Sequence, residues 1–434
     1  MAGAAATSTW RPTGALVRAV LAGSLLALVG VLLSRPALVV VAAPLLVAAL
    51  VALLRRPADA PLLLTHVGDR MLPEGSGTTL RAVVTGLELE QATRVVAPTS
   101  FTATHPVAGA VSSSATGRRD RVEVGVEVSP RRWGRREVGG GLVAVTSTWG
   151  GYRWGPAQVV GTPLTALPAP LPFDSHAETP RPTGLVGANR ASRDGQGTEF
   201  SGIREFATGD RLRRIHWRTS LRTGRLHTVT TTAEQDSEVL LVVDALADLG
   251  DSGGVDGAAS SLDTTVRAAA ALAEHHLRLG NRVGVRVVGG SAQVLRPAAG
   301  LRHQRRVLET LARVAPAPWD VAGTRLRLGA GAGTTVLALS PLLSPLVTTT
   351  LVDLAGRGLA VIAIDTLPDR ALPPTAETAA AALAWRLRLV ERRLELVQLA
   401  RARIPVVVWH GPGTLDEVMR RLARRSQLPR AVAR

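Results

Sequence analysis

Two long apolar runs near the N-terminus restrict the fold of this chain more than any other feature. They extend from Ala19 to Ser34 and from Ala37 to Leu54, and only the tight break Ser34-Arg35-Pro36 separates them. Each run is close to the length that crosses a lipid bilayer as a helix. We therefore predict that residues 1–57 form a short N-terminal tail and a transmembrane helical hairpin in the cell membrane.

The arginines around the two runs predict the orientation of this hairpin. Arg11 and Arg18 precede it and Arg55 and Arg56 follow it, whereas Arg35 alone lies at its tip. Because positive residues near membrane spans favour the cytoplasmic side, both ends and the soluble domains are expected in the cytoplasm. A signal peptide followed by a buried helix is the alternative, but no small-residue cleavage site stands between the runs.

Residues 58–170 change to short, alternating segments that are rich in Val and Thr and separated by Gly, Ser and Pro clusters. This pattern predicts a small all-β sandwich, with Trp133 and Trp154 in its core or at its rim. The expected strands cover residues 62–67, 78–84, 93–96, 121–128 and 142–147. Residues 171–194, rich in Pro, Ala and Gly, are interpreted as a linker.

Residues 238–434 alternate apolar strands with amphipathic helices. This order predicts a C-terminal α/β domain with a mostly parallel, doubly wound sheet covered on both faces. The expected strands are residues 238–243, 282–288, 335–339, 360–364 and 405–409, and the expected helices are 262–279, 303–314, 346–356, 376–403 and 414–426. The helix at 376–403 carries an apolar stripe that we expect to be buried on the sheet, namely Leu383, Leu387, Val390, Leu394 and Val397.

Residues 195–237 combine a high density of charge with repeated glycines and regularly placed apolar residues. We predict an ordered loop with one short helix, because a disordered linker would lack the apolar residues. Thr208-Gly209-Asp210 is expected to form a turn whose Asp210 caps a helical turn starting at Arg211. Trp217 would follow as an apolar anchor.

The order of residues in this segment resembles the signature of the domain-of-unknown-function 58 family. The matching runs are Phe200 to Phe206, Gly209-Asp210, Arg214 to Ser220 and Arg222 to Leu226. Members of that family are bacterial proteins commonly found beside MoxR-type AAA+ ATPases. The resemblance implies a von Willebrand factor A-like α/β domain and a MoxR-type AAA+ ATPase as partner.

Three interpretations of the signature residues remain open, and the first two can hold together. In the first, they form an ion-pair and hydrogen-bond network that docks the segment onto the sheet; in the second, they form a docking surface for a partner protein. In the third, the arginines bind the phosphate of a nucleotide or nucleic acid. The candidate residues are Arg204, Glu205, Gly209, Asp210, Arg214, His216, Trp217, Arg218, Ser220 and Arg222.

The sequence gives little support to catalytic or metal chemistry. Von Willebrand-type domains hold a divalent cation through Asp-x-Ser-x-Ser, whereas this chain has Asp244-Ala245-Leu246-Ala247-Asp248. Asp244 is thus the clearest candidate metal ligand, with Asp248, Asp251 or Ser252 as substitutes for the missing serines, but we expect neither a metal site nor a cofactor. The chain contains no Cys and no Lys, which excludes thiolate chemistry and a Walker-type phosphate loop. His275 and His276 are interpreted as surface or interface histidines.

These features predict a membrane-anchored, non-catalytic adaptor, and the family resemblance implies that it works with the AAA+ ATPase in the assembly or maturation of a client complex. A Mg-dependent or nucleotide-using enzyme on the α/β domain is one alternative. A basic membrane-bound nucleic-acid binder is the other, suggested by the formal net charge of +17. We expect no nucleic acid, because the loop contains acids of its own and lacks interleaved exposed aromatics.

Overall fold

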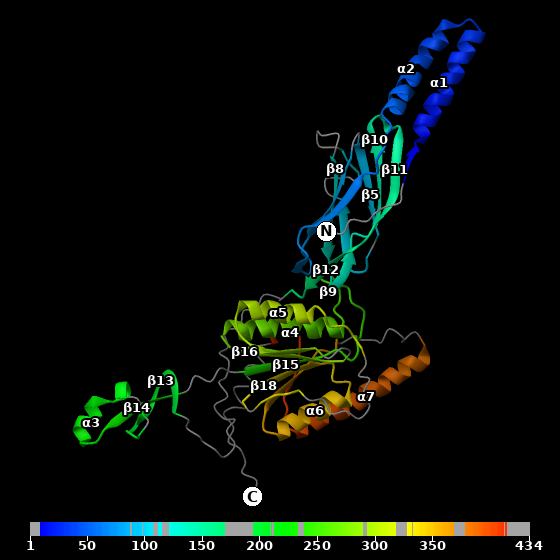
Figure 1. Ribbon diagram of the computed structural model, residues 1–434. Helices are drawn as coiled ribbons and strands as arrows, with labels where there is room; N and C mark the ends of the chain where they lie inside the picture. Colours follow the sequence, from blue (N-terminus) through cyan, green and yellow to red (C-terminus); the bar gives the residue numbers. More distant parts are fainter. Residues whose placement is uncertain are drawn as a thin grey trace. The chain divides into compact units, whose positions relative to one another are not determined.

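A computed structural model of the chain gives the arrangement of its elements (Figure 1). It describes residues 9–86, 89–97, 99–106, 112–114, 121–169, 194–208, 210, 212–232, 238–289, 293–317, 328–331, 333–368, 378–411 and 413–414. The chain divides into two compact units, one formed mainly by the residues up to 169 and the other mainly by those after it. The linker predicted at 171–194, except for Asp194, and the helix predicted at 414–426, except for Thr414, lie outside the described residues.

The N-terminal apolar runs form two helices side by side, α1 (Gly14–Leu32) and α2 (Pro36–Leu54) (Figure 1). Their mean hydropathies are 2.3 and 2.9, so both are long and apolar enough to cross a membrane. Glycine on α1 permits close packing, since a Cβ on Gly23 would lie 3.0 Å from the side chain of Leu46. The predicted helical hairpin is confirmed.

Three β-sheets occupy the middle of the chain. The five-stranded sheet has the order β1 (Trp10–Pro12), β11 (Tyr152–Val159), β10 (Gly141–Ser147), β5 (Leu89–Val96) and β7 (Ser112–Ser114). The four-stranded sheet has the order β2 (Leu62–Val67), β4 (Thr78–Thr85), β8 (Arg121–Pro130) and β6 (Thr102–Pro106). The three-stranded sheet has the order β3 (Met71–Pro73), β12 (Thr162–Leu167) and β9 (Gly134–Val138).

The two larger sheets share one hydrophobic core. Val84 and Val124 of the four-stranded sheet belong to the same buried cluster as Val143 and Trp154 of the five-stranded sheet. Alternation of apolar and polar residues places one side of each strand in this core, as the pattern of β8 shows. Trp133 is also buried.

Strand β1 joins the N-terminal tail to the five-stranded sheet, which the sequence did not predict. Trp10 pairs with Trp154 in antiparallel register, and the Trp10 indole donates a hydrogen bond of 2.8 Å to the Asp59 carbonyl. One residue beyond β1, Thr13 caps α1 and donates from its amide to Gly151. The first helix therefore starts directly from the sheet.

The second unit contains a six-stranded sheet that is parallel except at one edge. Its order is β17 (Val294–Ala298), β16 (Arg282–Val288), β15 (Glu238–Asp244), β18 (Thr335–Ser340), β19 (Ala360–Asp365) and β20 (Val406–Val408). Helices α4 (Ser261–Arg278) and α5 (Leu301–Leu311) cover one face, and α6 (Pro345–Gly356) and α7 (Ala379–Arg401) lie on the other (Figure 1). A C-terminal, mostly parallel α/β sheet is confirmed; β17, the antiparallel edge strand, was not predicted.

Helix α7 corrects the prediction that its apolar stripe is buried. Leu383, Leu387, Val390, Leu394 and Val397 are between 46 and 63 % exposed. The opposite side of the helix faces the domain instead, where Leu399 is fully buried and Leu396 packs on the same cluster. Both sides of α7 carry apolar residues at helical spacing, so the spacing did not identify the buried one.

The paired histidines of α4 correct a second prediction. His275 and His276 were expected at a surface or an interface, but they are only 6 % and 1 % exposed within the domain itself. Helix α4 carries small alanines on several sides, which lets it sit deeply between neighbouring elements. Its buried residues therefore extend well around the helix, and both histidines lie inside.

Candidate functional site

The signature segment, residues 195–237, is built around a two-stranded antiparallel sheet. Strand β13 (Asp194–Glu205) pairs with β14 (His227–Thr232), and Glu205 lies opposite His227. A short 3-10 turn at Leu212–Arg214 and helix α3 (Trp217–Thr223) lie between the two strands in the chain. The short helix was predicted to start at Arg211, whereas the described α-helix starts at Trp217, after the 3-10 turn, and the two strands were not predicted.

Arg204 and Asp210 hold the turn that follows β13. The Arg204 guanidinium donates two hydrogen bonds to the Asp210 carboxylate, of 2.7 and 2.8 Å, and a third of 3.0 Å to the Glu205 carbonyl. The Ala207 amide also donates to Asp210, at 2.8 Å. Hydrogen bonds from Arg204, and then from Ala207, lower the pKa of Asp210. A bidentate pair of this kind fixes both distance and orientation.

Further predictions about this turn fall outside the described residues. Gly209 and Arg211 belong to the positions that the structure does not describe, so the predicted cap of Asp210 at Arg211 remains a prediction. In the described part of the chain, the Asp210 carboxylate accepts hydrogen bonds from two preceding residues, Arg204 and Ala207.

His216 and Ser220 connect helix α3 to strand β14. The Nδ1 atom of His216 accepts from the Thr219 amide at 3.3 Å and caps the helix. The buried Ser220 hydroxyl donates to the His216 carbonyl at 3.0 Å and accepts from the His227 amide at 2.9 Å. These contacts assign a structural role to both side chains. Gly224, with a φ of 71°, ends the helix in the left-handed conformation that favours glycine.

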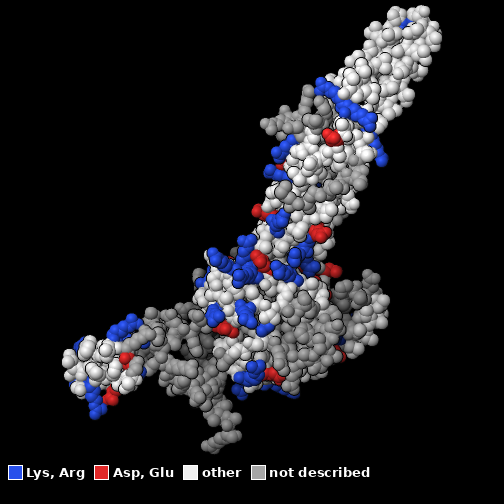
Figure 2. Space-filling view, viewed as in Figure 1, with Lys and Arg blue, Asp and Glu red and all other residues white. Residues whose placement is uncertain are grey.

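The outer face of α3 is apolar and cationic. Trp217 is 62 % exposed and Leu221 82 % exposed, and four-residue spacing places them on one side of the helix. Arg218 and Arg222 are exposed beside them at the same spacing. The prediction of Trp217 as an apolar anchor is therefore wrong, because the small Ser220 occupies the buried side of this short helix. Figure 2 shows blue arginine atoms next to white side chains on this segment.

The remaining candidates are held by neighbouring groups of the same segment. Glu205 forms an exposed ion pair of 3.1 Å with Arg225, a residue that was not singled out from the sequence. The Arg214 carbonyl accepts from the Thr228 hydroxyl at 3.3 Å. The structure thus brings Arg204 together with Asp210, and His216 with Ser220, while it places Trp217, Arg218 and Arg222 on the surface.

Asp244 ends strand β15, and donors engage both of its carboxylate oxygens. Oδ2 accepts from the Ser340 hydroxyl at 2.6 Å, and Oδ1 accepts from the Leu246 amide at 3.0 Å. Burial raises the pKa of Asp244, against the opposing effect of these two hydrogen bonds. A divalent cation needs several ionised or carbonyl oxygen ligands.

The neighbouring acids are engaged in the same way. Asp248 accepts from the Leu262 amide at 3.1 Å, and Asp365 pairs with Arg392 of α7. These acids meet hydrogen-bond donors and a guanidinium instead of converging on one point. The set does not fit the divalent cation that von Willebrand-type domains hold.

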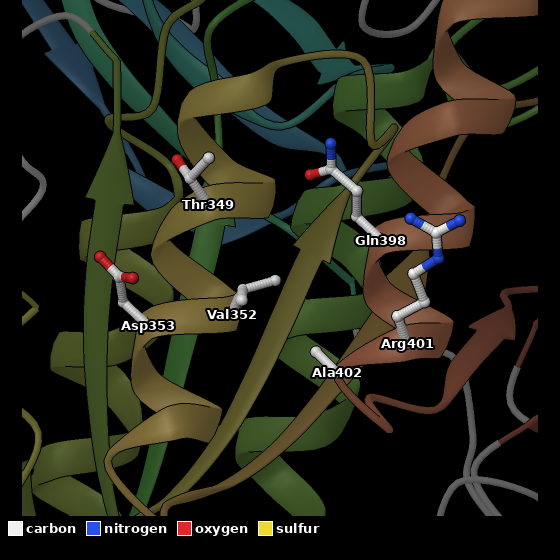
Figure 3. A pocket seen from close by; sticks show the side chains of 6 residues that line it. All are labelled: Thr349, Val352, Asp353, Gln398, Arg401 and Ala402. Atoms are coloured by element: carbon white, nitrogen blue, oxygen red, sulfur yellow. The ribbon is translucent and has the colours of Figure 1, made fainter.

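A pocket of about 340 Å³ lies between α6 and α7. Figure 3 shows its lining side chains, which are Thr349, Val352 and Asp353 from α6, Gln398 and Arg401 from α7, and Ala402 just after it. One acid and one arginine line an otherwise uncharged groove, which gives it no cluster of like-charged groups. No sequence signal pointed to it, because the groove arises from how two helices pack.

Comparison with known proteins identifies the domain. The family described as "Protein of unknown function DUF58" matches residues 202–381, from strand β13 into helix α7. The chain is 35 % identical over 130 residues to "Uncharacterized protein Rv1480" and "Uncharacterized protein MT1527" of Mycobacterium tuberculosis and to "Uncharacterized protein Mb1516" of Mycobacterium bovis. Each match covers 30 % of this chain and 40 % of the relative. Residues 202–381 therefore form a domain of the DUF58 family.

Proposed function

We propose that this protein is a membrane-anchored, non-catalytic adaptor whose partner binds the outer face of α3. The helical hairpin crosses the cell membrane with both ends in the cytoplasm, and the middle sheets form a sandwich. The α/β sheet is of the von Willebrand factor A type, and its strand order, with one antiparallel edge strand, supports this assignment.

The exposed pair of Trp217 and Leu221 on helix α3 carries the proposal. Large aromatic side chains and arginines contribute most of the binding energy in many protein interfaces. Here they are presented together, Trp217 and Leu221 on one side and Arg218 and Arg222 beside them. Internal hydrogen bonds already hold the helix below them, so binding requires little ordering of its backbone.

The charge of this face indicates the chemistry of the partner. Four arginines, Arg213, Arg218, Arg222 and Arg225, are exposed within the signature segment, which favours a partner with an acidic surface around an apolar pocket. We propose a MoxR-type AAA+ ATPase as this partner because of the family resemblance. Assembly or maturation of a client complex is the process that such a pair would serve.

Contacts at the base of the hairpin support the membrane anchor. The Arg56 guanidinium lies 5.7 Å from the centre of the Tyr152 ring. Arg56 follows helix α2 in the sequence, and Tyr152 packs against residues of α1 and α2. Arginine and tyrosine are typical of the membrane–water interface.

The hydrogen bonds that both carboxylate oxygens of Asp244 accept favour an adaptor over a metal-dependent enzyme.

The test is binding of the full-length chain, in detergent, to a purified MoxR-type AAA+ ATPase from the same organism. Trp217→Ala combined with Leu221→Ala should abolish binding without unfolding the segment, because both side chains are exposed. Trp149→Ala is the matched control, since Trp149 is also 62 % exposed but lies outside the signature segment, in the turn between β10 and β11. Equal binding by the double variant and the wild type would refute the proposed face.

A further inference from the structure

The exposed stripe of α7 has a regular heptad spacing. Leu383, Leu387, Val390, Leu394 and Val397, called here the α7 stripe, follow one another at intervals of four, three, four and three residues. This average of 3.5 residues keeps the stripe facing one partner helix along its whole length. At 1.5 Å per residue, the stripe is about 21 Å long. We propose that α7 pairs in parallel with the α7 of a second copy of this chain.

The back of α7 is already packed, whereas the described residues leave its stripe largely exposed. Arg392 donates to the Pro341 carbonyl at 2.9 Å and pairs with Asp365 of β19, while Leu399 lies in the core. Arg392 and Glu395 thus face inward, and leucines and valines face outward. Because the helix is folded before it meets a second copy, pairing does not carry the cost of forming an isolated helix.

Charges on the two flanks of the stripe select a second copy in parallel orientation. With Leu387 and Leu394 as the a positions of the heptad, Arg386 and Arg393 are at g and Glu391 is at e. In a parallel pair, g of one helix lies near the following e of the other, so Arg386 meets Glu391 of the second copy, twice by symmetry. In an antiparallel pair g faces g, and the arginines would repel one another.

A membrane surface fits the same stripe less well. Helices that lie in an anionic interface carry arginine or lysine along their polar face. Arg386 and Arg393 lie on one flank of the α7 stripe, whereas the other flank carries Gln398 and Glu391, whose side chain is 59 % exposed and pairs with Arg388 of the same helix. This second flank has no excess of positive charge that would attract anionic lipid, and Glu391 complements Arg386 of a second copy.

Cysteine cross-linking tests this pairing in the full-length chain in native membranes. The chain contains no cysteine, so a single introduced thiol reports only its own neighbours. In a parallel pair, Val397→Cys faces itself across the seam and should give a disulfide-linked dimer under mild oxidation. Leu301→Cys is the control, because Leu301 is 84 % exposed on α5, away from the stripe. Its cross-linked band should be absent.

Three other outcomes would overturn the proposal. If Val397→Cys cross-links only when mixed with Leu383→Cys, the helices are antiparallel. If Val397→Cys stays monomeric and resists a maleimide reagent, another part of the same chain covers the stripe; if it stays monomeric and reacts, nothing covers it.

A charge-reversal cycle gives an independent measurement of orientation. Arg386→Glu should reduce the cross-linking of Val397→Cys severalfold, and adding Glu391→Arg should restore it. Both side chains are exposed, so neither change disturbs the core. An increase of cross-linking with Arg386→Glu alone would contradict the parallel arrangement.

Discussion

Replacing His276 by leucine should reduce the acid sensitivity of the α/β unit between pH 7.5 and 5. His276 is 1 % exposed in helix α4, and its Nδ1 atom lies 3.2 Å from the Asn281 side-chain nitrogen. Burial, and then the neighbouring His275 ring at 5.4 Å, lower the pKa of His276 to about 3. The folded protein therefore keeps this histidine neutral across the range in which a free histidine becomes charged.

The sign and size of the effect follow from the two pKa values of His276. The unfolded chain takes up a proton near pH 6.5, whereas the folded chain does so near pH 3. The stability that depends on neutral His276 is thus fully present above pH 6.5 and is lost as the pH falls toward 3. At pH 5 the free energy of unfolding is lower than at pH 7.5 by about 2 kcal/mol. This value is RT times the natural logarithm of one plus the ratio of protonated to neutral His276 in the unfolded chain at pH 5.

Urea unfolding of the full-length chain in detergent, at pH 7.5 and 5, measures this loss. Hydrogen exchange of the α4 peptides, corrected for intrinsic exchange rates, measures the stability of the α/β unit, which contains His276. The loss of stability on acidification should be about 2 kcal/mol smaller in His276→Leu than in the wild type. His66→Leu, at an exposed position of β2, should keep the wild-type pH dependence. Equal acid losses in the wild type and His276→Leu would refute the reasoning.

Three further changes test the contacts that hold the chain together. Arg392→Ala leaves the buried Asp365 without its ion pair and should cost about 3–5 kcal/mol in urea unfolding, whereas Arg278→Ala, in an exposed pair on α4, should cost less than about 1 kcal/mol. Arg204→Ala should abolish the hydrogen-exchange protection of the Ala207 amide, because Asp210 then loses the bidentate partner that orients it. Gly23→Leu should separate α1 from α2 and increase protease cleavage at the base of the hairpin, with Leu21→Ala, at an exposed position of α1, as the control.

The sequence predicted those elements whose pattern follows directly from burial. Continuous apolar runs gave α1 and α2, and strands such as β15, buried on both faces, were recognised from their unbroken Val and Leu. Short edge strands escaped prediction. β1 has three residues and β17 contains Pro297, and both depend on a neighbouring strand for their pairing. Their own side chains carry too little pattern to reveal them.

The candidate site was predictable in its composition but only partly in its geometry. Family resemblance and charge density selected Arg204 and Asp210, which the structure joins as a bidentate pair. Arg225, the partner of Glu205, lay within the matching run but was not singled out, because a pair across two strands depends on their register. Trp217 was placed inside, since size and apolarity suggest burial, although local packing on a seven-residue helix favours Ser220.

Helices α4 and α7 show what apolar spacing alone leaves undetermined. In α4, small residues such as Ala268 and Ala270 are buried on opposite sides, so the helix is enclosed and even its histidines are covered. In α7, Arg392 and Glu395 face the domain and the larger apolar side chains face outward. Leaving apolar surface exposed costs roughly 25 cal/mol per Å², and the five side chains of the α7 stripe all add to the exposed area. A helix that faces arginine inward and leucine outward is therefore stabilised further when its outer side is covered, and the heptad spacing and flanking charges of α7 match a second α7.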